Sequence, residues 1–309
     1  MAAKTCPNRY YERMESSSDD KLKIAKFLTD GDAVLDVGAG GGALAELLLA
    51  HFPNMRITAI DQSDTAIARL EALSEKYAGR LSVVQADFFA FEPTEQFDAV
   101  VFCSSLHEMF SYTKFEGKFF QKEVVGNALS RAAACLKQET GKIIIRDGVA
   151  STHNPRVLVR YKDSELKELA ERFENEFDGF PLEIVHTPFG DVMPYNSMRE
   201  LLYTVTWGKE SFGREVKEWY GFFSLEDWKA EEQWLYVSSG LVLVHSEKYL
   251  QPGYKEHLQN KVEIQSAPRL KMDGSIQSKP IEFPASNCLV VFSNQFGATH
   301  KRGERHGEK

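Results

Sequence analysis

The sequence is poor in cysteine, and the few cysteines are far apart. Only four occur, at Cys6, Cys103, Cys135 and Cys288, and no two of them form a C-x-x-C pair. This spacing provides neither a zinc-binding cluster nor a disulfide framework. We therefore expect small buried cysteines in a reduced compartment, and no metal site.

A long apolar segment is also missing. No run approaches the about 18 apolar residues that span a bilayer, and residues 1–7 lack the apolar stretch of a secretory signal. We expect a cytoplasmic protein without a membrane partner. The sequence predicts nothing about the oligomeric state.

An excess of basic charge is absent too. The chain of 309 residues has 45 acidic and 37 basic residues, a net charge of −8. An acidic protein repels a polyanion at long range, so a nucleic-acid partner is not expected unless a local basic patch outweighs the rest. The alternative of an RNA-binding enzyme depends on one group of basic residues: Arg156, Arg160, Lys209, Arg214 and Lys217.

What the sequence does have is a glycine-rich turn between a strand and a helix. Residues 34–37 are typical of a buried strand, and Asp36 lies near its carboxyl end. Gly38, Gly40 and Gly42 follow at alternate positions, before a helical pattern over residues 43–50. Glycine lets a ligand approach bare backbone, and the helix start presents free N–H groups. This arrangement predicts the first βα turn of a nucleotide-binding α/β fold.

The carboxylate of Asp36 separates two kinds of nucleotide site. It would repel a pyrophosphate on the loop, as in dinucleotide-binding dehydrogenases, but it suits a ligand with a cationic group. The pattern D-x-G-x-G-x-G resembles motif I of the class I S-adenosylmethionine-dependent methyltransferases. The resemblance implies S-adenosyl-L-methionine as cofactor, held by Asp36 and by loop residues Gly38, Ala39, Gly40 and Gly42. The alternative is that Asp36 only caps the glycine turn.

The next two predicted strands, residues 56–61 and 81–87, also end on acidic residues. Asp61 is placed to accept hydrogen bonds from ribose hydroxyls. In the family that the chain resembles, the acid after the third strand binds the adenine amino group beside an apolar neighbour, which implies these roles for Asp87 and Phe88. Gln62 and Cys103 complete the expected cofactor site. Both acids have an alternative role as caps of the following turn.

Polar residues follow the fourth predicted strand, residues 96–103. In the methyltransferases this loop faces the transferable methyl group, so His107 and Glu108 are the candidate catalytic residues, as base and orienter or as acceptor-binding groups. The alternative is that His107 caps the next helix or pairs with a carbonyl. The fifth strand ends on Arg146 and Asp147, which we expect to form a solvated charge pair.

The resemblance implies a Rossmann-like, doubly wound α/β sheet of seven strands, the last antiparallel, with a helical and aromatic-rich insertion after the fifth strand. Strands over residues 241–246 and 287–293 complete the sheet. The expected segments are residues 1–30 as an N-terminal helical lid, 31–150 as the cofactor-binding core, 151–223 as an acceptor-binding insertion, 224–297 as the end of the sheet with an excursion at 249–285, and 298–309 as a disordered tail.

We therefore expect a methyltransferase that transfers the methyl group in line to a small-molecule acceptor. The alternatives are an RNA methyltransferase, a dehydrogenase that uses NAD, and a non-catalytic subunit that only binds S-adenosylmethionine. The sequence does not identify the acceptor, because the same fold supports methyl transfer to carbon, nitrogen, oxygen and sulfur.

Overall fold

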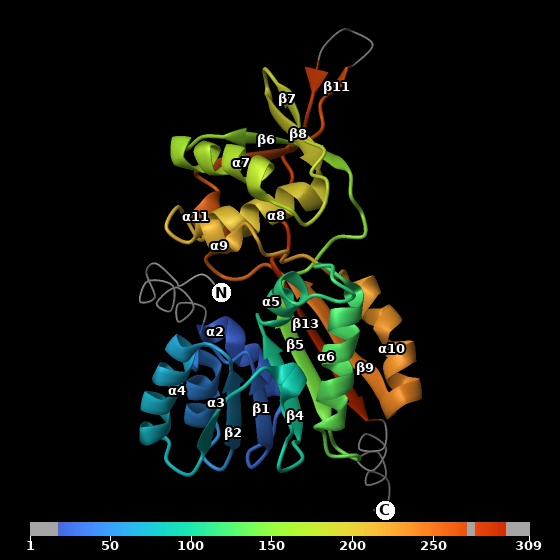
Figure 1. Cartoon of the computed structure of the whole chain (residues 1–309). Helices are drawn as coiled ribbons and strands as arrows, with labels where there is room; N and C mark the ends of the chain where they lie inside the picture. Colours follow the sequence, from blue (N-terminus) through green and yellow to red (C-terminus); the bar gives the residue numbers. More distant parts are fainter. Residues whose placement is uncertain (1–17, 271–275, 295–309) are drawn as a thin grey trace, which may run out of the picture.

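The computed structural model describes residues 18–270 and 276–294, and a seven-stranded sheet is its central element (Figure 1). The strand order is β3-β2-β1-β4-β5-β13-β9. The first five are parallel, and β13 runs antiparallel to both of its neighbours. This confirms the predicted Rossmann-like sheet. The strands are β1 (Ala33–Val37), β2 (Arg56–Asp61), β3 (Leu81–Gln85), β4 (Ala99–Cys103), β5 (Lys142–Asp147), β9 (Leu241–Tyr249) and β13 (Asn287–Asn294).

Helices cover both faces of this sheet. One apolar core joins it to η1 (Leu22–Phe27), α3 (Ala43–His51) and α4 (Asp64–Lys76). A second core lies on the other face, beneath α5 (Leu106–Tyr112), α6 (Lys122–Ala134) and α10 (Leu225–Ser239). The central strands β1 and β4 are buried along their whole length, as expected for parallel strands covered on both sides. Two short elements, α2 (Ser18–Lys21) and η2 (Phe88–Ala90), lie near the sheet ends.

A second body is built mainly from the segment after β5, and it is not purely helical as expected. It has a four-stranded antiparallel sheet, β10-β6-β8-β7, besides its helices. The predicted excursion at 249–285 supplies β10, which pairs with β6. The strands are β6 (Arg156–Tyr161), β7 (Val185–Thr187), β8 (Gly190–Pro194) and β10 (Val262–Ser266), and the helices are α7 (Ser164–Glu176), α8 (Tyr195–Thr206), α9 (Phe212–Glu215) and α11 (Tyr254–Leu258).

The second body lies above the end of the large sheet where α5 begins (Figure 1). Its own core contains Phe173, Phe177 and Phe212, so many of the insertion's aromatic residues serve packing. The strands β11 (Arg269–Leu270) and β12 (Ile276–Gln277) form a small separate ladder. Within the described ranges, no helix combines the length and apolarity needed to cross a bilayer. The expected tail at 298–309 and most of the expected lid fall outside the described residues.

Candidate functional site

The glycine-rich loop packs its bare backbone against the start of α5. Gly38, Gly40 and Gly42 all adopt positive φ angles, of 70°, 56° and 83°. A side chain at Gly38 would also collide with its surroundings, because a Cβ atom there would lie 2.6 Å from Cβ of Ser105. The loop is fixed to β2 through the Gly38 amide, which donates to the Ile60 carbonyl at 2.9 Å. Glycine is thus required here both by conformation and by space.

Asp61 holds the far side of this loop. Its Oδ2 accepts a hydrogen bond from the Gly40 amide at 2.9 Å, and its Oδ1 accepts one from the Ser63 amide at 2.9 Å. Asp61 thus holds the turn before α4, but the N-cap of this helix is Ser63 and not Asp61. Each carboxylate oxygen has a second lone pair, so the residue keeps acceptor capacity for ribose hydroxyls. Its neighbour Gln62 is exposed.

Asp36 is a buried carboxyl group whose Oδ2 has no hydrogen-bond partner among the described residues. Burial raises its pKa to about 7, although the charge of nearby Lys21 acts in the opposite direction. Leaving a buried carboxylate oxygen unpaired is costly. A cationic ligand group beside this oxygen would remove the cost. The residues at the end of β1 therefore fit a ligand such as S-adenosylmethionine, which carries an amino group and a sulfonium.

The remaining expected cofactor residues differ in exposure. Asp87 is exposed, and its side chain accepts from the Phe89 amide at 2.9 Å, so it caps η2. Phe88 is buried and lies edge-to-face on Phe102, with ring centroids 5.6 Å apart. Ala39 and Cys103 belong to the core on the opposite face. Contact of these four residues with the cofactor stays a prediction.

His107 lies on α5, and each of its two ring nitrogens faces a carboxylate. Nδ1 is 2.7 Å from Oδ1 of Asp147, and Nε2 is 3.4 Å from Oε2 of Glu218. Tyr220 stacks on the ring at a centroid distance of 4.5 Å. Burial alone would favour the neutral ring, but the charges and hydrogen bonds of Asp147 and Glu218 outweigh it and raise the pKa well above its usual value. The two carboxylates therefore favour the protonated ring of His107.

Glu108 was one candidate to orient His107, but in this structure Asp147 makes that contact. Asp147 takes this role from the end of β5, and its Oδ2 also accepts the amide of His107 at 3.1 Å. Glu108 instead accepts a hydrogen bond from the Arg214 guanidinium at 2.6 Å. Consecutive side chains on a helix point in different directions, so two adjacent residues rarely form such a pair.

The expectation of a solvated Arg146–Asp147 pair is also wrong. Both side chains are buried, and they have different partners. The Arg146 guanidinium donates to Asp20 on α2, to Ser104 at 2.6 Å and to Gln251 at 3.0 Å. Side chains of successive strand residues project from opposite faces, which separates the two.

Three buried glutamates of the second body contact either His107 or Tyr220, the residue whose ring stacks on it, and sequence reasoning did not single them out. Glu218 accepts hydrogen bonds on Oε1 from Tyr112 and Arg214, both at 3.0 Å. Glu215 accepts from the Tyr220 hydroxyl, and burial together with the charge of Glu218 raises its pKa to about 8. The carboxylate of Glu200 accepts from the backbone amide of Tyr220 at 3.0 Å. The only signal in the sequence was a charged segment, which is typical of an exposed helix.

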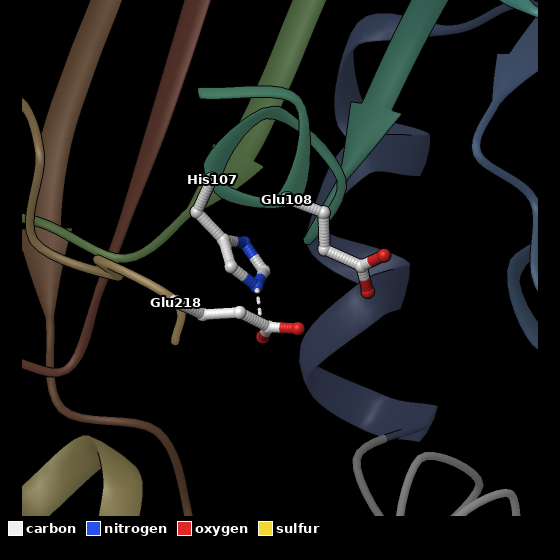
Figure 2. Close-up of side chains that lie close together, drawn as sticks. All are labelled: His107, Glu108 and Glu218. Carbon is white, nitrogen blue, oxygen red and sulfur yellow. Dashed lines mark ion pairs between the residues drawn. The ribbon is translucent and has the colours of Figure 1, made fainter. Parts of the chain in front are cut away.

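Within the described residues, one set of side chains could bind a metal ion. His107, Glu108 and Glu218 each place one ligand atom so that all three lie within 4.8 Å of one another (Figure 2). No metal site was expected from the sequence, because it has no cluster of cysteines and histidines. The three side chains found here come from two distant segments and have no recognisable spacing.

The basic residues that would form an RNA-binding patch are each engaged within the chain. Each one contacts an acidic side chain or a carbonyl oxygen: Arg156 with Glu183, Arg160 with the carbonyl of Phe189, Lys209 with Glu168, Arg214 with Glu108 and Lys217 with Asp178. Acidic partners thus neutralise four of the five charges.

Comparisons with known proteins agree with this fold. A family model described as a methyltransferase domain matches residues 34–139. Ribosomal RNA small subunit methyltransferase H of Synechococcus sp. (strain CC9311) is 35% identical over 74 residues, which cover 24% of each chain. Release factor glutamine methyltransferase of Rhodopirellula baltica is 39% identical over 102 residues, 32% of this chain and 34% of the relative. The chain thus matches about a quarter to a third of these relatives' length.

A solved structure extends the likeness over most of the chain, at the level of fold. The pyocyanin biosynthetic protein PhzM superimposes with a TM-score of 0.51 and 14% identity, over 94% of this chain and 60% of that protein. Residues 34–139, which include the glycine loop, thus match a methyltransferase domain, and the sheet around them has a Rossmann-like strand order.

Proposed function

We propose that this protein is a methyltransferase that uses S-adenosylmethionine to methylate a small molecule, bound between the large sheet and the second body. The observation that carries the proposal is Asp36, a buried carboxyl group with an unpartnered oxygen beside a glycine loop. A sulfonium cofactor supplies a methyl group that is already activated. The chain therefore has to align the acceptor and exclude water, which can account for about 7–11 kcal/mol of the barrier.

The acceptor side of the proposed site is the cluster around His107. Ser105 packs on Gly38 and lies only two residues before His107, so α5 links the cofactor loop to this cluster. The second body contributes Glu218 and Tyr220 from above. In this proposal Asp147 fixes the orientation of the imidazole, while His107 and Glu108 are the residues that contact the acceptor.

A small-molecule acceptor is favoured over RNA by two observations. The net charge of −8 repels a polyanion, and the basic residues of the second body are paired internally. Tyr220 stacks on His107, and Tyr203 stacks on Tyr220 at a centroid distance of 5.4 Å; aromatic rings of this kind are common in small-molecule sites.

Calorimetric titration with S-adenosylmethionine and, separately, with NAD tests the proposal. We expect binding of S-adenosylmethionine alone, and weaker binding by an Asp36→Asn variant, which keeps the shape of the side chain but removes its charge. Binding of NAD instead would refute the proposal and restore the dehydrogenase. A protein that binds S-adenosylmethionine but methylates no small molecule would support the non-catalytic alternative.

A further inference from the structure

Two adjacent residues of α5, His107 and Glu108, meet Glu218, which comes from a distant part of the chain. Figure 2 shows the first two on α5 and the third on the segment after α9, with both carboxylates projecting toward the space beside the imidazole. Nε2 of His107 and Oε2 of Glu218 are 3.4 Å apart. This separation is compatible with two atoms that bind the same ion, since metal–ligand bonds of about 2.0–2.2 Å hold neighbouring ligands slightly more than 3 Å apart.

The groups behind these three side chains resemble the supporting shell of a metal site. Asp147 contacts Nδ1 of His107 at 2.7 Å, which turns Nε2 toward Glu218. Tyr112 and Arg214 both donate to Oε1 of Glu218, so Oε2 is the oxygen that faces the imidazole. Metal-binding histidines usually donate their other nitrogen to a carboxylate, and metal-binding carboxylates are hydrogen-bonded in turn.

The charge in this cluster also favours a cation. The carboxylates of Asp147, Glu108 and Glu218 lie around the His107 ring, beside the guanidinium of Arg214. Nearby Glu215 is 1% exposed, and its Oε1 has no hydrogen-bond partner in the described part of the chain. A divalent ion beside Nε2 would place positive charge among these carboxylates, while Arg214 keeps its contacts with Oε1 of Glu218 and Oε1 of Glu108.

We propose that His107, Glu108 and Glu218 bind a divalent first-row transition metal ion, such as Zn²⁺ or Co²⁺. One imidazole nitrogen and two carboxylate oxygens form a donor set that suits such ions, and three protein ligands leave a position open. An acceptor that binds to the ion at this open coordination position, and loses its proton there, is a role that rests on the proposed function. Binding of the ion itself does not.

The test is titration of the full chain with Co²⁺, followed by its visible absorption, and displacement of Co²⁺ by Zn²⁺. We expect one Co²⁺ per chain, with a spectrum that Zn²⁺ abolishes. Glu108→Gln and Glu218→Gln should each bind Co²⁺ at least about tenfold more weakly, and Asp147→Asn, which alters only the support of His107, about 10–100-fold more weakly. Glu108 is half-buried, so Glu108→Gln should fold. Its affinity for Co²⁺ tests the metal site if Glu218→Gln does not fold.

A matched control is His186→Gln. His186 also lies between two carboxylates, 2.9 Å from Asp191 and 3.2 Å from Glu174, but on the surface. Its removal should leave the Co²⁺ spectrum unchanged. Absence of a spectrum in the wild type, or equal Co²⁺ binding by wild type and Glu108→Gln, would overturn the metal site. A parallel titration with S-adenosylmethionine separates the two proposals. If the protein binds S-adenosylmethionine but not Co²⁺, the proposed function stands without the metal site. If it binds Co²⁺ but not S-adenosylmethionine, only the metal site stands.

Discussion

Replacement of Asp61 by alanine tests the cofactor site most sharply. The carboxylate already holds the Gly40 and Ser63 amides at 2.9 Å, so its position at the end of β2 is fixed before any ligand binds. Two ribose hydroxyls donating to it would form two hydrogen bonds to a charged group, each contributing about 1.5–3 kcal/mol. The variant should thus lose about 3 kcal/mol or more of binding free energy, about a 100-fold weaker affinity for S-adenosylmethionine.

Isothermal titration calorimetry measures this loss directly. Asp61→Asn keeps one acceptor oxygen and should bind with intermediate affinity. The control is Asp64→Ala at the start of α4. Asp64 is exposed, and within the described ranges its side chain accepts only from the Gln85 amide group, at 2.6 Å. If Asp61→Ala folds normally and binds S-adenosylmethionine as tightly as the wild type, the ribose is held elsewhere and the reasoning fails.

Three further predictions concern stability. Gly38→Ala should lower the free energy of unfolding in urea by about 1–3 kcal/mol, because the added Cβ atom clashes and the backbone has a φ that alanine rarely adopts. Gly117 has a φ of 81° but open space around it, so Gly117→Ala should lower this free energy less. Phe173→Ala should cost about 3–5 kcal/mol in the core of the second body, measured in the same way. Glu215 has an ordinary pKa of 4.5 and a folded pKa of about 8, so the folded state retains a proton that the unfolded state releases. Wild-type stability should therefore fall as the pH rises from 4.5 to 8, and the melting temperature of Glu215→Gln should fall less over this range; a parallel pH profile in both proteins would contradict the assignment.

The placement of the residues expected to bind the cofactor could be predicted, because it is set by local sequence. Asp36 and Asp61 lie near the carboxyl ends of β1 and β2, Asp87 lies just after β3, and parallel strands bring these ends to the same edge. The glycines between β1 and α3 are likewise tied to one turn, so their positive φ angles follow from the pattern itself.

The surroundings of His107 could not be predicted, because they depend on contacts between distant segments. Glu218 meets His107 only after the second body has folded over α5, and Asp147 reaches it from β5. The missed sheet has the same cause: β6 is a short apolar strand that could equally belong to a helix, and its partner β10 lies far along the chain. Burial of a charged residue is a property of such packing and leaves little trace in the local pattern.

The position of β13 has a consequence for the order in which the chain can fold. This strand comes last among the described elements, yet it lies inside the sheet, between β5 and β9. During synthesis β5 therefore has an unpaired edge, and β9 has no neighbour in the sheet, until residues 287–294 leave the ribosome. Long-range pairing of this kind is slow and exposes strand edges to other chains. Loss of these eight residues would divide the sheet from within, whereas loss of an edge strand would only narrow it.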